Sequence, residues 1–249
     1  MSNTNRRILL DIGAHHGESL TYALDPIYSF DLIFSFEPSP ACWDALGRFR
    51  DPRLRIERFG LAKESKVVPL YGSGEVGASL FPDKVGQGNT YDLVRVESVE
   101  SWFRSNTVPT DDVWVKINCE GSELEIVEEL VRPWIAQRIS NVILTPDLLK
   151  VTSLAHEHER LLELLQGAPF RFSIRDERHT SRQFLGWLKS ARTSIFNFAH
   201  LLFLFGRHQP KYFVWRQRFA ELAPAKLTDL CFGLLGRAAW KARLRRLIP

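Results

Sequence analysis

Short apolar runs alternate with amphipathic stretches along about the first two thirds of the chain. The runs are typical of buried strands, and apolar residues spaced three or four apart are typical of helices that bury one face. Strands that alternate with helices form mostly parallel sheets with helices on both faces, so we expect a doubly wound α/β fold. The predicted strands are residues 8–10, 32–36, 55–59, 66–71, 113–117, 142–144 and 170–174, and the predicted helices are 18–24, 41–49, 122–130 and 156–165.

The alternation stops after residue 175. Residues 184–205 are apolar and aromatic with scattered basic residues, and residues 227–248 have a helical pattern that is also basic. We therefore divide the chain into a domain of residues 1–180 and a basic, aromatic-rich helical extension of residues 181–249.

Charge separates the same two parts. The segment from Arg182 to Pro249 has 13 Lys and Arg residues against two acids, a net charge of +11. The chain as a whole has a net charge of +4, so the preceding residues have a net charge of −7. Two charge regimes in one chain indicate two tasks. The extension could be a substrate lid, a surface for anionic lipid headgroups, or a solvated and partly core-packed helix. We favour peripheral membrane contact combined with a lid, and expect no nucleic-acid partner, because no recognition module is visible.

Cysteine usage and the amino-terminal residues indicate the compartment. The three cysteines are far apart and odd in number, which is typical of a reducing environment. A strand pattern begins at Ile8, which leaves no room for a signal peptide, and no apolar stretch is long enough to span a bilayer. We expect a cytoplasmic protein, with peripheral attachment at the inner face of the membrane left open.

A glycine pattern, Asp11-x-Gly13-x-x-x-Gly17, follows the first predicted strand and precedes a helix. Glycine lets the backbone turn sharply and approach a ligand closely, and ligands bind at the carboxyl ends of such strands. The pattern lacks the middle glycine of G-x-G-x-x-G, which argues against a nicotinamide dinucleotide. It suits the cationic methionine part of S-adenosylmethionine, with Asp11 placed to favour that cation. The alternative is an ordinary turn between a strand and a helix.

Two more strand ends carry polar residues. Glu37 ends the second predicted strand, where a carboxylate can accept hydrogen bonds from both ribose hydroxyls of a nucleotide. Asn118 and Glu120 follow the strand 113–117 and project near the same edge of the sheet. The acids of the next helix are expected to form a solvated face; they are Glu123, Glu125, Glu128 and Glu129.

Five segments, in their order and spacing, resemble the FkbM-type methyltransferase family over residues 8–175. They are Asp11-Ile-Gly-Ala-His-His-Gly17, Phe36-Glu37-Pro38, Leu61-Ala62, Gly77-Ala-Ser79-Leu80 and Lys116-Ile-Asn-Cys-Glu-Gly-Ser-Glu-Leu124. The resemblance implies a Rossmann-like class I methyltransferase that transfers a methyl group from S-adenosylmethionine to a hydroxyl, commonly of a sugar or polyketide. By position, Asp11, Gly13 and Gly17 hold the methionine part, Glu37 holds the ribose, Leu61 and Ala62 flank the adenine, and Ala14 and Asn118 are further cofactor contacts.

Two residues depart from the family pattern. Asn118 stands where the family usually has Asp, and asparagine is neither a carboxylate base nor a strong ligand for a hard cation. We therefore expect no metal in the site; His156 and His158 do not share a helix face either. His15 stands where the family usually has Asn. It could contact the cofactor, act as a base near neutral pH, or pack at the turn.

These features predict an O-methyltransferase that acts on a sugar hydroxyl of a small molecule, glycan or glycolipid. Methyl transfer from a sulfonium mainly requires alignment, and a base assists deprotonation of the acceptor. Glu120 and His15 are the catalytic candidates; the other possible bases are His16, Asp147, His156 and His158. A non-catalytic binding or scaffold protein on the same fold, suggested by Asn118, is the alternative, and a nicotinamide-dependent oxidoreductase is disfavoured.

Overall fold

The computed structural model describes residues 5–86, 88–175, 184, 187 and 188. The chain divides into two units, Met1–Thr180 and Ser181–Pro249. The predicted extension lies outside the described residues except for Phe184, Trp187 and Leu188. Its helical structure, and its roles as a lid or a membrane contact, therefore stay predictions, and the following description concerns the first unit.

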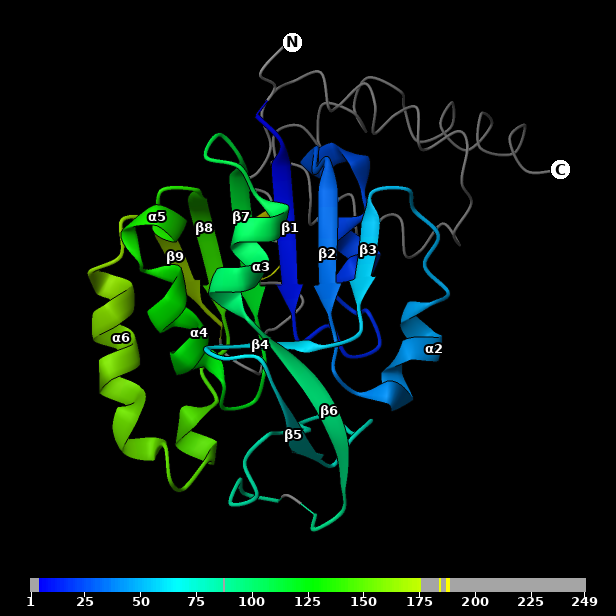
Figure 1. Ribbon diagram of the computed structural model, residues 1–249, viewed down its shortest axis with the longest axis vertical. Helices are drawn as coiled ribbons and strands as arrows, with labels where there is room; N and C mark the ends of the chain where they lie inside the picture. The colour runs from blue at the N-terminus through cyan, green and yellow to red at the C-terminus, as the bar shows by residue number, and fades with distance from the viewer. Residues whose placement is uncertain (1–4, 87, 176–183, 185–186, 189–249) are drawn as a thin grey trace, which may run out of the picture. The chain divides into compact units, whose positions relative to one another are not determined.

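Six parallel strands form the main sheet of the first unit (Figure 1). Their spatial order is β3-β2-β1-β7-β8-β9. This is the order of doubly wound, Rossmann-like sheets, so the predicted fold class is confirmed. The order reverses between β1 and β7, and ligands of such sheets bind at the carboxyl ends of the strands at this point. The strands are β1 (Arg7–Ile12), β2 (Leu32–Phe36), β3 (Leu54–Glu57), β7 (Asp112–Ile117), β8 (Ile139–Leu144) and β9 (Arg171–Ile174).

Helices cover both faces of this sheet. Figure 1 shows α3, α4 and α6 on the face toward the viewer, while the segment that contains α1 lies behind the strands. The two predicted helices nearest the amino terminus are shorter than expected, because residues before α1 form turns and residues before α2 form a 3-10 helix. The α-helices are α1 (Leu20–Ala23), α2 (Trp43–Leu46), α3 (Val99–Asn106), α4 (Glu123–Leu130), α5 (Pro133–Ala136) and α6 (His158–Gln166), and the 3-10 helices are η1 (Pro26–Tyr28), η2 (Pro40–Cys42), η3 (Leu148–Lys150) and η4 (Ala155–Glu157).

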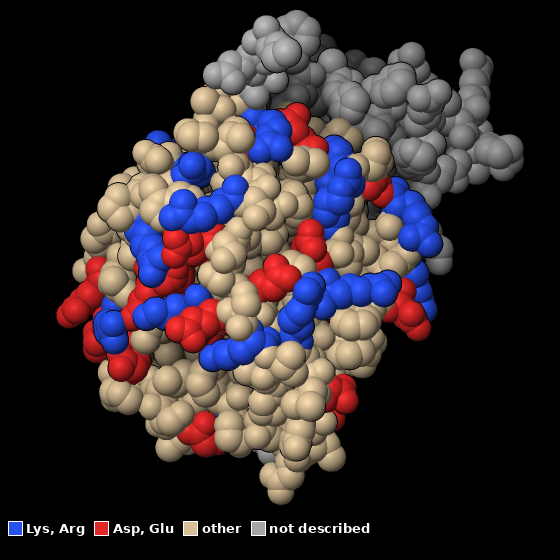
Figure 2. Space-filling view, in the orientation of Figure 1, with Lys and Arg blue, Asp and Glu red and all other residues tan. Residues whose placement is uncertain are grey.

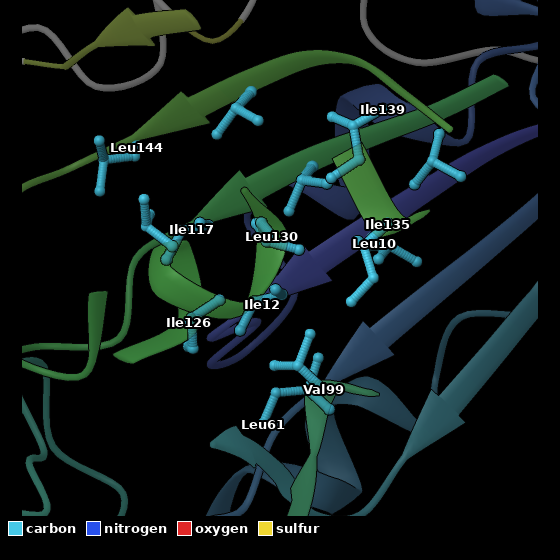
Figure 3. Packing of buried hydrophobic residues seen from close by; sticks show 14 of the residues in the cluster. Leu10, Ile12, Leu61, Val99, Ile117, Ile126, Leu130, Ile135, Ile139 and Leu144 are labelled. Atoms are coloured by element: carbon cyan, nitrogen blue, oxygen red, sulfur yellow. The ribbon is translucent and has the colours of Figure 1, made fainter. Parts of the chain in front are cut away.

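The core fills the space between the sheet and its front helices. In β1, the five residues from Ile8 to Ile12 are all buried, as expected for a central parallel strand covered on both faces. Figure 3 shows Ile12 and Ile117 facing Ile126 and Leu130 of α4. The continuous apolar runs of the central strands therefore match their position in the sheet. None of the described helices is both long enough and apolar enough to cross a membrane.

A second, three-stranded sheet is inserted between β3 and α3. The predicted strand 66–71 is confirmed as β5 (Lys66–Tyr71), which pairs antiparallel with β6 (Tyr91–Ser98). The sequence did not predict β6, α3 or β4 (Gly60–Ala62). In Figure 2 the lower part of the view, over the loops that join β5 and β6, is largely uncharged, whereas acidic and basic side chains alternate over the helices.

The predicted solvated face of the helix after β7 is wrong for two of its four acids. Glu123 is fully buried and Glu129 is 2% exposed. Glu123 turns back to accept hydrogen bonds from the backbone that precedes the helix, and Glu129 forms an ion pair with Arg132 at 3.0 Å. The apolar spacing of the helix does not reveal this, because Glu123 bonds to the loop before the helix and Arg132 lies just beyond its last residue.

Candidate functional site

The carboxyl ends of four parallel strands bring most of the predicted site residues together. Asp11 lies near the end of β1, and the loop after β1 carries Gly13, Ala14, His15 and Gly17. Glu37 follows β2, Asn118 and Glu120 follow β7, and Asp147 follows β8. Backbone hydrogen bonds join these ends, since the N–H groups of Gly13 and Ala14 donate to Phe36 and that of Asn118 donates to Ile12. The predicted residues therefore share one edge of the sheet.

Asp11 is fully buried, and its carboxylate is occupied by groups of the chain itself. One oxygen lies 2.9 Å from Nζ of Lys116, and the other accepts a 2.5 Å hydrogen bond from Oγ of Ser19. Lys116, 4% exposed, also donates to the carbonyl of Gly13 at 2.6 Å. Asp11 and Lys116 thus tie β1, β7 and the glycine loop together. Lys116 was not predicted from the sequence as a partner of Asp11.

Contacts within the chain require glycine at both positions 13 and 17 of the loop. Gly13 has φ +75°, and a Cβ there would lie 1.9 Å from the carbonyl oxygen of Asn118. Gly17 has φ +89°, and its Cβ would lie 2.4 Å from the ring of Phe49. A side chain at either position would therefore disturb the fold of the loop, whatever ligand it binds.

Glu37 connects the end of β2 to the glycine loop. It is 7% exposed, and its two carboxylate oxygens accept the backbone N–H groups of His15 at 2.7 Å and Ser39 at 2.8 Å. Burial raises the pKa of Glu37, while these two hydrogen bonds partly offset the shift. A carboxylate oxygen can accept more than one hydrogen bond, so each retains capacity for a further donor.

His15 has an uncommon backbone conformation for a residue other than glycine, with φ +50°. Its Nδ1 lies 2.9 Å from a carboxylate oxygen of Glu18, and its ring lies 3.9 Å from that of His16, centroid to centroid. Its Nε2 is buried and has no hydrogen-bond partner among the described residues. The ring of His15 is therefore oriented from one side and available on the other.

Glu120 also has a left-handed backbone, with φ +56°. Its carboxylate forms an ion pair with Nζ of Lys84 at 2.7 Å, and the two side chains are 15% and 6% exposed. Oγ of Ser79 donates to the carbonyl of Glu120 at 2.6 Å. The ion pair orients the carboxylate of Glu120, and Lys84 was not predicted from the sequence.

The segment between β5 and β6 reaches across this edge of the sheet. It contacts the residues after β2 through Ser73, whose hydroxyl lies 2.7 Å from that of Ser39. It contacts the residues after β8 through Asp83, which accepts the N–H of Ser153 at 2.6 Å. The same segment carries Ser79 and Lys84, so it covers Glu120 with side chains that are distant from it in sequence.

Glu123, predicted from the sequence to be solvated, is a buried titratable group. Its carboxylate accepts N–H groups from Cys119 and Gly121 at 3.0 to 3.2 Å. Burial, with a smaller contribution from the charge of Asp147, raises the pKa of Glu123 to about 7. Its place as the first residue of α4 was a usable signal, because a side chain there can reach back to buried backbone N–H groups of the preceding loop, which need acceptors.

Several buried polar atoms near the ends of β7 and β8 lack hydrogen-bond partners within the described part of the chain. They include Oγ of Ser122, Oγ1 of Thr145 and Oδ2 of Asp147, whose other oxygen lies 2.9 Å from Nζ of Lys150. A buried polar group without a partner costs about 1–3 kcal/mol, so such groups are uncommon unless a ligand or solvent satisfies them. This part of the edge is therefore suited to a polar ligand.

The remaining predicted residues lie elsewhere. Leu61 and Ala62 form β4, and both side chains are buried; Leu61 belongs to the core beside Val99 (Figure 3). The imidazole of His156 is exposed and lies 3.4 Å from a carboxylate oxygen of Glu157, and His158 begins α6. The adenine contacts predicted for Leu61 and Ala62 have no exposed side chain to carry them and stay predictions.

Cys42 lies buried in η2, next to the end of β2. Burial raises the pKa of its thiol to about 11, and the charge of Glu37 adds to the shift. The structure brings this cysteine close to His15 and His16 of the glycine loop.

Comparison with known proteins gives one similarity, in structure. No family model matches the chain, and no curated protein matches it. Among solved structures, the methyltransferase FkbM of Methylobacillus flagellatus is 18% identical, aligned over 66% of this chain and 38% of that chain, with a TM-score of 0.42. The chain thus spans well under half the length of that protein, which bears the name of the family that the sequence motifs resemble.

Proposed function

We propose that the chain is an S-adenosylmethionine-dependent O-methyltransferase that acts on a sugar hydroxyl of a glycan or glycolipid. The observation that carries the proposal is the position of Glu37. Its carboxylate holds the glycine loop through the N–H of His15, beside the point between β1 and β7 where the strand order reverses. Each of its oxygens has remaining capacity for one hydroxyl of a ribose. The family resemblance of the sequence motifs supports the choice of donor.

The residues then have separate tasks. S-adenosylmethionine, when bound, supplies a methyl group on a positively charged sulfur. Glu37 orients the ribose, and the loop held by Asp11 and Lys116 fixes the position of the donor. The acceptor oxygen bonds to the methyl carbon as the bond from that carbon to sulfur breaks, and Glu120 accepts the hydroxyl proton. His15 is the second candidate for this base.

Donor binding is tested with Glu37→Gln, which keeps the size of the side chain and one acceptor oxygen. Calorimetry with S-adenosylmethionine should show binding weakened by about 1–3 kcal/mol, because charge-assisted hydrogen bonds are lost. Glu64→Gln, at an exposed position, is the control and should bind as the unaltered chain does. Equal affinity of both variants would remove Glu37 from the site, and stabilisation by a nicotinamide nucleotide instead would favour an oxidoreductase.

Catalysis is tested by formation of S-adenosylhomocysteine with candidate cell-envelope sugars as acceptors. Glu120→Gln should lower kcat by about 10²–10⁴-fold, the usual contribution of a general base, while the Kd for the donor stays the same. Donor binding without turnover on any acceptor would favour the non-catalytic alternative, which Asn118 suggests.

We also propose that the segment from Arg182 to Pro249 contacts anionic membranes from the cytoplasmic side. Its net charge of +11 and its interleaved aromatic residues support this proposal. Each basic residue near an anionic surface contributes about 1 kcal/mol. The full chain should co-sediment with anionic vesicles and be released by salt; absence of binding at low salt would leave a lid or a core extension.

A further inference from the structure

Two neighbouring histidines meet a cysteine from another segment beside the glycine loop. His15 and His16 lie in the loop after β1, and Cys42 ends η2 after β2. One ligand atom from each residue, an imidazole nitrogen or the thiol sulfur, lies within 4.8 Å of the other two. We propose that these three side chains bind a divalent transition-metal ion, for which zinc is the best fit.

The spacing of the three ligand atoms is close to that of a zinc site. Zinc binds nitrogen at about 2.0–2.1 Å and sulfur at about 2.3 Å, so neighbouring ligand atoms of a tetrahedral site lie roughly 3.5 Å apart. The observed separations reach at most 4.8 Å. A side-chain movement of about 1 Å toward the centre is enough to close the site. The two segments need not separate or refold.

Glu18 gives His15 the orientation of a metal ligand. An ionised carboxylate only accepts hydrogen bonds, so Nδ1 of His15, 2.9 Å from Glu18, is the protonated nitrogen. Nε2 then carries the free lone pair, and this atom is buried without a hydrogen-bond partner among the described residues. A carboxylate that holds the second nitrogen of a histidine is the usual support of a metal-binding imidazole.

The backbone around the cluster is already fixed. His15 is held at φ +50° by its N–H bond to Glu37 at 2.7 Å, and the N–H of Cys42 donates to the carbonyl of Ser39 at 3.2 Å. A non-glycine residue with positive φ persists where the surroundings enforce it, and such residues gather at functional sites. Ordering the loop after β1 therefore subtracts little from the free energy of metal binding.

The ligand set selects the kind of metal. Two imidazoles and a thiolate suit zinc and its neighbours, and disfavour magnesium and calcium, which prefer oxygen. The site thus differs in place and chemistry from the hard-cation site that Asn118 argues against. Three protein ligands leave a fourth position open. A bound ion would link the loop after β1 to η2, on the two sides of Glu37. It would occupy Nε2 of His15, so Glu120 would remain as the base of the proposed function.

The experiment is a titration of the full, metal-free chain with Co²⁺ followed by Zn²⁺. We expect one equivalent of Co²⁺ to give the near-ultraviolet thiolate-to-cobalt absorption, and Zn²⁺ to displace it. Cys42→Ser should abolish the band, and His16→Ala should weaken binding at least about 100-fold, since loss of a ligand exceeds loss of a supporting residue. Glu18→Gln should weaken it by about 10-fold.

Two matched controls locate the site. Cys119→Ser and His156→Ala change a cysteine and a histidine outside the cluster and should keep both band and affinity. His16 is exposed, so its variant tests the proposal even if Cys42→Ser fails to fold, which circular dichroism detects. Absence of one-equivalent binding, or a band that survives in a folded Cys42→Ser variant, overturns the proposal.

Discussion

The loops that follow β1 and β7 lie at the same edge of the sheet but satisfy their polar groups differently. At the end of β1, the carboxylate of Asp11 is shared by Lys116 and Ser19, and in the loop that follows, the N–H of His15 donates to Glu37. After β7, Oγ of Ser122 has no partner among the described residues, and Glu123 has a strongly raised pKa. The end of β1 is therefore a framework whose buried carboxylate is paired within the chain, whereas the loop after β7 leaves a buried hydroxyl for a ligand.

The largest effect should come from opening that framework. In Lys116→Met, the buried carboxylate of Asp11 loses its cation, which should lower the free energy of unfolding by about 3–5 kcal/mol. Urea denaturation measures the loss. The double variant Asp11→Asn with Lys116→Met should recover part of it, because no unpaired charge remains. If Lys116→Met is as stable as the unaltered chain, the two loops do not differ in the way described.

Gly13→Ala should be next in size. The added Cβ would lie 1.9 Å from the carbonyl oxygen of Asn118 and would hold alanine at φ +75°, so we expect a loss of about 2–4 kcal/mol. Gly86→Ala, with φ +79° and nothing within 4 Å, isolates the backbone term and should cost about 1 kcal/mol. Gly88→Ala has neither problem and should be neutral. Equal losses at positions 13 and 86 would contradict the close contact between the loops.

The loop after β7 should respond to pH through Glu123. Its pKa is about 7 in the folded chain and near the ordinary 4.5 when unfolded, so folding retains a proton between these values. The stabilising contribution is therefore complete below pH 4.5 and is lost as pH rises through about 7, a change of about 1–3 kcal/mol.

Glu123→Gln cannot titrate, so its stability relative to the unaltered chain should increase with pH over this window. Thermal unfolding at a series of pH values measures the difference. Glu64→Gln, at an exposed position, should follow the unaltered chain throughout. Parallel curves for Glu123→Gln and the unaltered chain would show that Glu123 does not titrate differently on folding.

Thr145→Val should give the smallest effect. Thr145 follows β8, and its N–H donates to the carbonyl of Ile117 at the end of β7, so the variant probes the edge beside the second loop. The buried hydroxyl of Thr145 has no described partner, so its replacement by a methyl group should leave stability within about 1 kcal/mol, or raise it. Thr107→Val is the matched control, because Oγ1 of Thr107 donates to the carbonyl of Phe103 at 2.8 Å and its loss should destabilise by about 1 kcal/mol. The reverse ranking would mean that Thr145 has a partner within the protein.

Local pattern was enough to predict the main sheet. The strand predicted at 32–36 coincides with β2, and that at 113–117 lies within β7, because central strands read as apolar runs and turns carry glycine. β6 was missed although Val94 and Val96 are buried, since charged residues alternate with them and β6 belongs to a small sheet of three strands with exposed side chains on one face. The pattern of apolar residues therefore identifies strands best where both faces of the sheet are covered.

The sequence by itself also determined which residue types gather at the strand ends, since parallel topology places Asp11, Glu37 and Asn118 at one edge. Only the tertiary structure decided what each group does there. The partner of Asp11 lies 105 residues away, and Cys42 meets His15 from another segment. Burial and pairing depend on such distant neighbours, which periodicity along the chain does not encode, so a residue's place can be predicted before its partners can.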